Sequence, residues 1–145
     1  MKIVNWDEYT KLLQKLFNEV QFRIFDDIVS IGRGGSVVAA YLSSRMGIPR
    51  FCPTFVRNVG RGTEMRIEVY DLCQIESLSG TLLVVDDWLC EGRAMNYVLE
   101  RIPRGTVITT LVMYNRRGSE FKPDIVGEYV KEEEREILFP YNAMG

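Results

Sequence analysis

The stretch TLLVVDDWLCEGRA, residues 81–94, decides the fold of this chain. Its first five residues, Thr81 to Val85, are aliphatic or β-branched, which predicts a buried β-strand. Asp86 and Asp87 follow this strand directly, and a turn around Gly92 precedes apolar residues at helical spacing. A strand that leads through a short polar loop into a helix is the repeating unit of α/β proteins.

The rest of the chain repeats this alternation of strand and helix. Apolar residues at helical spacing predict an amphipathic helix over 6–20, with Asn5 or Asp7 as its cap. Further helices are expected over 36–46 and 95–102, and strands over 27–31, 50–56, 65–70 and 106–114. Because the strands are mostly apolar on both faces, we expect an α/β fold, a Rossmann-like parallel sheet flanked by helices, as one domain over 1–145.

The composition excludes several kinds of chemistry. The 145 residues contain no histidine, which removes Ser/His and Cys/His nucleophile pairs and histidine-ligated metals. The three cysteines are widely separated, which argues against a zinc site and against a disulfide framework. A net charge of −2 disfavours nucleic acid as a partner. Neither a signal peptide nor an apolar run long enough to span a membrane is visible, so the expected location is cytoplasmic.

A cluster of glycines follows the predicted strand over 27–31. Gly32, Gly34 and Gly35 allow backbone conformations closed to other residues and let amide N–H groups approach an anion. The start of the next helix adds a partial positive charge, and Arg33 adds a full one. An ordinary tight turn is the alternative, but such a turn needs one glycine rather than three with an arginine. The pattern favours an anion site.

Asp86 and Asp87 form an acidic pair at the end of the most strand-like segment. Two adjacent carboxylates beside a core are costly unless they bind a ligand. Paired acids accept hydrogen bonds from the vicinal hydroxyls of a ribose, or they hold a hydrated cation. The helix that begins in the next turn offers free N–H groups suited to a phosphate. The alternative is that both acids cap this helix and face water.

These residues resemble the phosphoribosyl pyrophosphate motif of the type I phosphoribosyltransferases. In that motif apolar residues precede two acids, two further apolar residues and a small phosphate loop, as in Leu83 to Ala94. Gly32 to Gly35 is similar to the pyrophosphate loop of the same family. The tail, including Ile-Leu-Phe-Pro-Tyr at 137–141, is similar to the hood of the xanthine-guanine and archaeal hypoxanthine members. The resemblance implies a flexible lid and a small C-terminal hood, approximately 115–145.

The resemblance implies a role for each matching residue. Asp86 and Asp87 would act in catalysis with Arg33, and the two acids would hold the ribose hydroxyls directly or through the water of a bound Mg²⁺. The lid, over 58–63, would contribute Arg61. Asn115 and Ile137 would contact the base. The 5′-phosphate would bind at Cys90, Glu91, Gly92, Arg93 and Ala94, and pyrophosphate would bind at Gly32, Arg33, Gly34 and Gly35.

The implied activity is a magnesium-dependent transfer of the phosphoribosyl group from phosphoribosyl pyrophosphate to a nucleobase, a 6-oxopurine, with release of pyrophosphate. The family generally pairs through its first core helices, so a homodimer or homotetramer is expected. The resemblance further implies a strained or cis peptide bond near Gly32.

Four features depart from the family pattern. Glu91 and Ala94 replace the usual Thr or Ser, Cys90 replaces an aspartate of the purine members, residues 114–117 lack their lysine, and Glu136 replaces an aromatic residue. The alternative reading is a non-catalytic nucleotide-binding or regulatory protein on the same fold.

Overall fold

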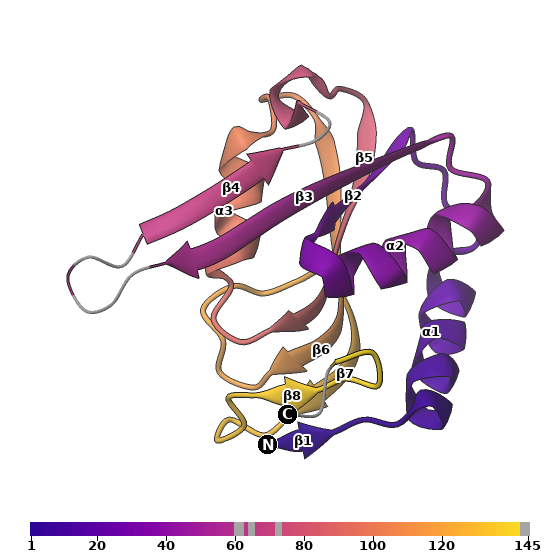
Figure 1. Cartoon of the computed structure of the whole chain (residues 1–145). Helices are drawn as coiled ribbons and strands as arrows, with labels where there is room; N and C mark the ends of the chain where they lie inside the picture. The colour runs from indigo at the N-terminus through magenta and orange to yellow at the C-terminus, as the bar shows by residue number, and fades with distance from the viewer. Residues whose placement is uncertain (60–62, 64–65, 72–73, 143–145) are drawn as a thin grey trace.

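A six-stranded sheet in the order β4-β3-β2-β5-β6-β7 is the main element of the structure, a computed structural model that describes residues 1–59, 63, 66–71 and 74–142 (Figure 1). All neighbouring strands are parallel except the antiparallel pair β3–β4, so five strands form a parallel sheet. The strands are β2 (Asp27–Ile31), β3 (Arg50–Val59), β4 (Arg66–Asp71), β5 (Thr81–Leu89), β6 (Val107–Arg116) and β7 (Ile125–Val130).

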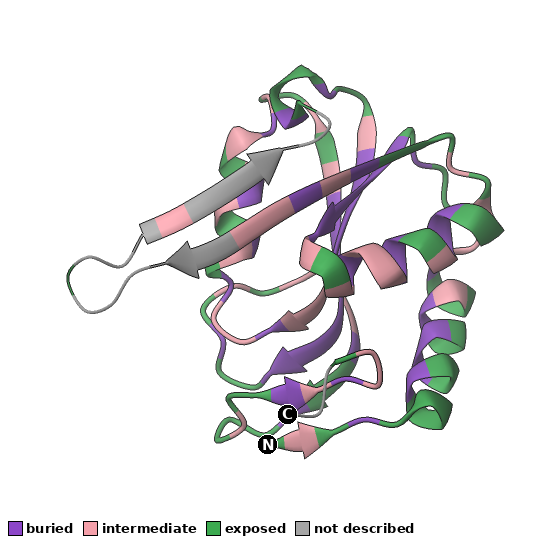
Figure 2. Cartoon of the chain, in the orientation of Figure 1, coloured by how far each residue is buried: buried purple, intermediate pink, exposed green. Residues whose placement is uncertain are grey.

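Helices cover both faces of this sheet, which confirms the expected α/β fold. The helices α1 (Trp6–Val20) and α2 (Gly32–Met46) pack on one face, and α3 (Arg93–Arg101) packs on the other. A short 3-10 turn, η2 (Ile75–Ser77), precedes β5. Asn5 caps α1, because its side chain accepts a hydrogen bond from the Glu8 N–H at 2.8 Å. Strand β2 is buried along its whole length, as are residues 82–85 of β5 (Figure 2).

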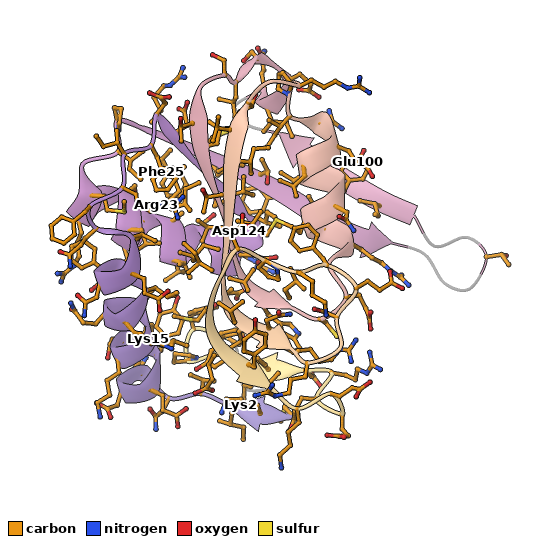
Figure 3. All side chains as sticks on the ribbon, turned by 180° about the vertical axis from the view of Figure 1, so that it is seen from behind. Lys2, Lys15, Arg23, Phe25, Glu100 and Asp124 are labelled. Atoms are coloured by element: carbon orange, nitrogen blue, oxygen red, sulfur yellow. The ribbon has the colours of Figure 1, made fainter. Side chains whose placement is uncertain are left out.

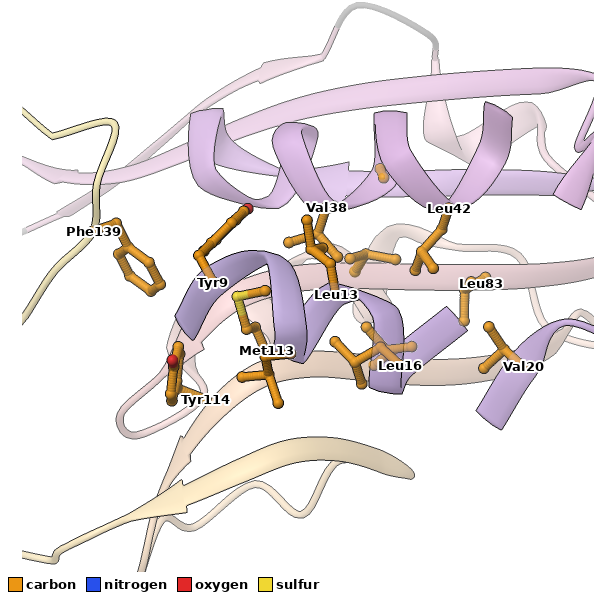
Figure 4. Packing of buried hydrophobic residues seen from close by; sticks show 14 of the residues in the cluster. Tyr9, Leu13, Leu16, Val20, Val38, Leu42, Leu83, Met113, Tyr114 and Phe139 are labelled. Atoms are coloured by element: carbon orange, nitrogen blue, oxygen red, sulfur yellow. The ribbon is translucent and has the colours of Figure 1, made fainter. Parts of the chain in front are cut away.

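The first core cluster contains Leu13 and Leu16 of α1, Val38 and Leu42 of α2, and Leu83 of β5 (Figure 4). These residues recur at helical spacing on α1 and α2, so each helix presents one apolar face to the sheet. The second cluster lies on the opposite face, between α3 and the strands. Together the two clusters fix where β2 and β5 end, and therefore where the loops that follow them lie.

Two boundaries differ from the sequence prediction. The helix α2 begins at Gly32 rather than at Ser36, because the Ser36 hydroxyl donates to the Gly32 carbonyl at 2.7 Å and closes the first turn. The strand β5 continues through Leu89, because its last residues still pair with β6, so both acids lie within the strand. Gly32 has a φ of +68°, and the described residues contain no cis peptide bond. A cis bond near Gly32 is therefore a wrong expectation, whereas the left-handed backbone there requires glycine.

The N-terminus is attached to the C-terminal segment. Strand β1 (Lys2–Ile3) pairs in parallel with β8 (Ile137–Leu138), and the terminal ammonium of Met1 lies 3.1 Å from the Glu134 carboxylate. The Lys15 ammonium on α1 donates to the carbonyl of Gly127 on β7 at 2.7 Å; Figure 3 shows Lys15 and Lys2 from behind. The first residues of the chain therefore support the segment that was predicted to be a hood.

Three further expectations from the sequence concern the cysteines, Arg61 and membrane-spanning segments. Cys52 on β3 is disulfide-bonded, contrary to the expectation that the scattered cysteines form no disulfides, and Cys90 is free. Arg61, the predicted lid contact, lies outside the described residues. Within the part of the chain that is described, no helix is long and apolar enough to cross a membrane.

We predict that Arg50→Ala lowers the free energy of unfolding by about 1–3 kcal/mol, because it leaves a buried carboxylate without its partner. Asp27 is fully buried at the start of β2, and its two oxygens lie 2.8 and 2.6 Å from nitrogens of the Arg50 guanidinium. Urea denaturation measures the effect. Arg104→Ala, which removes another exposed arginine, is the control and should be neutral; an unchanged stability of Arg50→Ala would contradict the prediction.

Candidate active site

The direction of chain crossing reverses between β2 and β5. From β2 the chain passes through α2 to β3 on one side, whereas from β5 it passes through α3 to β6 on the other side. In a parallel sheet such a reversal opens a crevice at the carboxyl ends of the two strands, and ligands bind there. The carboxyl ends of β2 and β5 carry the two motifs that the sequence singled out, Gly32 to Gly35 and Asp86-Asp87.

The first turn of α2 lies directly against the acidic pair. A Cβ atom placed on Gly34 would come within 1.7 Å of Oδ2 of Asp87. A Cβ on Gly35 would lie 2.8 Å from the carbonyl oxygen of Val85 and 3.3 Å from Cα of Asp86. Neither position has room for a side chain, so glycine is what permits the approach. The glycine turn and the two acids that were predicted from separate segments thus meet at one place.

The two acids point to different surroundings. Asp86 lines a cavity in front of α3, and its Oδ1 accepts a hydrogen bond from the Asp87 N–H at 2.8 Å. Burial and then the neighbouring charge of Asp87 raise the pKa of Asp86 well above its ordinary value. Asp87 instead faces Gly34, and its Oδ2 accepts a hydrogen bond from the Tyr141 hydroxyl at 2.5 Å. Burial and the charge of Asp87 raise the pKa of Tyr141, so this hydroxyl stays protonated.

The cavity beside Asp86 has a volume of about 540 Å³. Its floor is the start of α3, where free N–H groups suit an anion. Gly92 has a φ of +102°, and a Cβ there would lie 2.3 Å from Cβ of Phe121, so this turn requires glycine on two grounds. The lining includes all five residues predicted to bind the 5′-phosphate, which are Cys90, Glu91, Gly92, Arg93 and Ala94, with Trp88, Glu120 and Arg135 also around it.

Glu91 is neutralised by two arginines rather than by Arg93. Its Oε1 accepts hydrogen bonds from Arg116 and from Arg135, each at 2.7 Å. These interactions lower the pKa of Glu91, with Arg135 as the main cause. Arg116 is almost fully buried and also donates to the carbonyl of Cys90 at 3.1 Å. The carboxylate in the loop before α3 therefore carries no uncompensated charge.

The predicted base contacts lie elsewhere. Asn115 is fully buried, and its amide donates to the Leu89 carbonyl at 3.2 Å and to the Ser119 hydroxyl at 2.9 Å. It does not line the cavity, and its side chain connects the end of β5 to the loop after β6; its contact with a base stays a prediction. Ile137 is buried beside Lys2 in the β1–β8 pair and also does not line the cavity. Its contact with a base stays a prediction.

Arg33 and Arg93 are exposed cations of the site. Arg33 projects from the first turn of α2, and Arg93 is the first residue of α3. Neither side chain makes an ion pair with another residue in the described parts of the chain. Two helix starts on neighbouring loops therefore each present a guanidinium, an arrangement suited to a ligand with two separate phosphate groups.

Three residues at the site were not given a role by sequence reasoning. Arg116 and Arg135 lie 25 and 44 residues from Glu91, and Tyr141 lies 54 residues from Asp87. No spacing rule connects positions so far apart, because the crossovers of the sheet bring them together. The sequence offered one indication of their importance. In the resembling family, the segments that match residues 114–117 and 137–141 lie near the base.

Comparison with known proteins gives a consistent result. No protein-family model matches the chain. The chain is 27% identical over 143 residues to the xanthine-guanine phosphoribosyltransferase of Idiomarina loihiensis, covering 96% of this chain and 85% of that protein. The purine phosphoribosyltransferase of Pyrococcus horikoshii superposes with a TM-score of 0.79 at 18% identity, covering 99% and 95% of the two chains. A protein of Neisseria gonorrhoeae with bound ppGpp superposes with a TM-score of 0.72 at 19% identity, covering 99% and 90%.

The fold and the two converging motifs resemble those of the type I phosphoribosyltransferases. Within this class, the chain resembles the xanthine-guanine and archaeal purine enzymes along almost its whole length, as the sequence resemblance predicted.

We predict that Gly34→Ala destabilises the protein, by about 1–3 kcal/mol, because the added methyl group overlaps the Asp87 carboxylate. Alanine alone would favour the helix by about 1 kcal/mol, so a loss of stability isolates the overlap. Urea denaturation measures the change. Ser44→Ala on the exposed side of α2 is the control and should be neutral or stabilising. An increase in stability of Gly34→Ala would show that the turn and the acids are not in contact.

We predict that Glu91→Gln reduces stability in a pH-dependent way, because it removes the negative partner of the buried Arg116. The folded-state pKa of Glu91 is lowered, so its contribution is present above the unfolded pKa of about 4.3 and is lost as the pH falls through the folded value. Urea midpoints of wild type and variant should therefore differ near pH 7 and converge as the pH falls through the lowered folded-state pKa. Glu120→Gln at the same cavity is the control; equal midpoints at neutral pH would contradict the prediction.

Proposed function

We propose that this chain is a phosphoribosyltransferase that transfers the phosphoribosyl group of phosphoribosyl pyrophosphate to a purine base and releases pyrophosphate. The observation that carries the proposal is the contact of the Gly34–Gly35 turn with Asp86 and Asp87, beside a cavity formed by the start of α3. The names of the relatives support the activity. The finer proposal, a 6-oxopurine as the base, rests on the xanthine-guanine relative.

Each part of the site has a task in this reaction. The N–H groups at the start of α3 would bind the 5′-phosphate, and Asp86 at the inner wall of the cavity would accept hydrogen bonds from the ribose. The first turn of α2, with Arg33, would hold the pyrophosphate as negative charge accumulates on it. This arrangement stabilises the leaving group when the bond to C1 of the ribose breaks, and the surrounding protein excludes competing water.

Magnesium is compatible with these residues. Within the described residues, no group of three or more Cys, Asp or Glu side chains is placed to enclose a metal, and Asp86 and Asp87 are the carboxylates that would hold one. Mg²⁺ is usually held by one or two carboxylates, with water and substrate phosphates as the other ligands. When bound, it would neutralise charge on the pyrophosphate. We therefore include Mg²⁺ in the proposal.

A non-catalytic nucleotide-binding or regulatory protein is the second candidate. The similar protein of Neisseria gonorrhoeae holds ppGpp, which shows that a chain of this fold binds a phosphorylated guanosine. The carboxylate of Glu91 in the phosphate loop also departs from the catalytic members. A regulatory protein would bind a guanine nucleotide without turning over phosphoribosyl pyrophosphate.

The experiment that separates the two candidates measures pyrophosphate release from phosphoribosyl pyrophosphate and Mg²⁺ with a panel of bases. The panel contains xanthine, guanine, hypoxanthine, adenine and uracil. We expect release with at least one 6-oxopurine and much less with adenine or uracil. Binding of ppGpp without release from any base would overturn the enzyme proposal in favour of the regulatory one.

We predict that the double variant Asp86→Asn, Asp87→Asn loses more than about 100-fold in affinity for phosphoribosyl pyrophosphate with Mg²⁺, because the negative charges that would strengthen binding of the ribose and of the metal are removed. Its fold should persist, because the amide oxygens of asparagine still accept hydrogen bonds and because two buried carboxylates no longer repel each other. Calorimetric titration measures the affinity. An Asp26→Asn variant, at the opposite end of the sheet, is the control; unchanged affinity of the double variant would reject the ribose role.

A further inference from the structure

The hydroxyl of Tyr141 forms a hydrogen bond with Asp87, the second acid of the site. It donates to Oδ2 of Asp87 at 2.5 Å, across 54 residues of sequence. The same hydroxyl would lie 2.8 Å from a Cβ on Gly34, so it sits at the junction of β5, α2 and the C-terminal segment. None of the roles assigned above uses this residue.

Rigid aromatic packing holds the Tyr141 ring in place. It stacks on Phe139 with ring centroids 5.3 Å apart and an interplanar angle of 4°. It also meets Tyr9 of α1 edge to face, at 5.5 Å and 84°. The Phe139 N–H donates to the Asn142 side chain at 2.8 Å, which closes the turn that contains Tyr141. Figure 4 shows Tyr9, Tyr114 and Phe139 together at one end of the core. The donor is therefore preorganised, as a supporting group must be to fix a site.

The carboxylate of Asp87 needs such a donor to keep one orientation. Asp86 is the adjacent residue and carries the same kind of charge, so the two acids repel each other when both are ionised. On the other side, the space against Gly34 holds the carboxylate only because no Cβ is present. The Tyr141 hydroxyl donates to Oδ2 of Asp87 and so directs this oxygen.

We propose that Tyr141 is a positioning residue, which fixes the Asp87 carboxylate between the first turn of α2 and the ribose of the substrate. The inference rests on the proposed phosphoribosyl transfer and names a residue that sets affinity for the phosphoribosyl donor rather than for the base. The C-terminal segment thereby takes part in binding the sugar, in addition to closing the end of the core.

Tyr141→Phe removes this donor and keeps the ring. We expect it to weaken the binding of phosphoribosyl pyrophosphate with Mg²⁺ by roughly 5- to 20-fold, as the loss of one hydrogen bond to a charged group does. The KM for this substrate should rise by a similar factor while the KM for the base stays unchanged. Calorimetric titration and initial rates measure the two effects.

Tyr114→Phe is the matched control. The Tyr114 ring packs on the same Phe139, with ring centroids 5.8 Å apart. The charged groups that act on the Tyr114 hydroxyl are Glu128 and Glu8 rather than Asp87. Tyr114→Phe should keep wild-type affinity. Unchanged affinity of Tyr141→Phe, or an equal loss in both variants, would overturn the positioning role, because the second result assigns the effect to aromatic packing.

A double-mutant cycle tests the contact independently of substrate. The effects of Tyr141→Phe and Asp87→Ala on urea unfolding should be non-additive, because each variant removes one partner of the same hydrogen bond. Additive effects would overturn the inference. If the wild type binds no phosphoribosyl pyrophosphate while the cycle shows coupling, the proposed function fails and the Tyr141–Asp87 contact stands. If the wild type binds it and Tyr141→Phe binds equally well, only the inference fails.

Discussion

The first turn of α2 reaches the acids of β5 because Gly34 and Gly35 carry no side chains. Strand β2 pairs with β5 only as far as Val85, so beyond that point backbone hydrogen bonds no longer set the spacing between the two segments. Direct packing of the glycine turn on Asp86 and Asp87 sets it instead. The crevice between the strands, the direction of each carboxylate and the place of Arg33 all follow from this contact.

Because β5 extends through both acids, Asp86 and Asp87 face opposite sides of the sheet. Successive residues of a strand face opposite sides of the sheet. Val84 belongs to the core cluster of α3, and Val85 belongs to that of α1 and α2. Asp86 continues the first side and meets the cavity, whereas Asp87 continues the second and meets Gly34 and Tyr141. A helix-capping role for both acids, the alternative reading of the sequence, does not fit residues that lie within the strand.

Sequence reasoning recovered the elements and the two motifs but not the cross-links between them. Apolar periodicity located α1, and the run 81–85 located β5, because burial leaves a local pattern. The start of α2 was placed too late, since glycines read as a loop although Ser36 closes a helical turn onto Gly32. Asn115 was assigned to the base by family position alone, while its neighbours Leu89 and Ser119 give it a structural task. Contacts such as Arg116 with Glu91 depend on the crossovers and leave no local pattern.

The charge balance of the phosphate loop accounts for its departure from the family pattern. A carboxylate beside a phosphate would repel it, but Glu91 is turned onto Arg116 and Arg135. Arg116 also binds the Cys90 carbonyl, and the Phe121 N–H donates to the Glu91 carbonyl, so the backbone of this loop is fixed from the side of β6. Here the carboxylate neutralises the buried guanidinium that shapes the loop, and the N–H groups of α3 remain directed at the cavity.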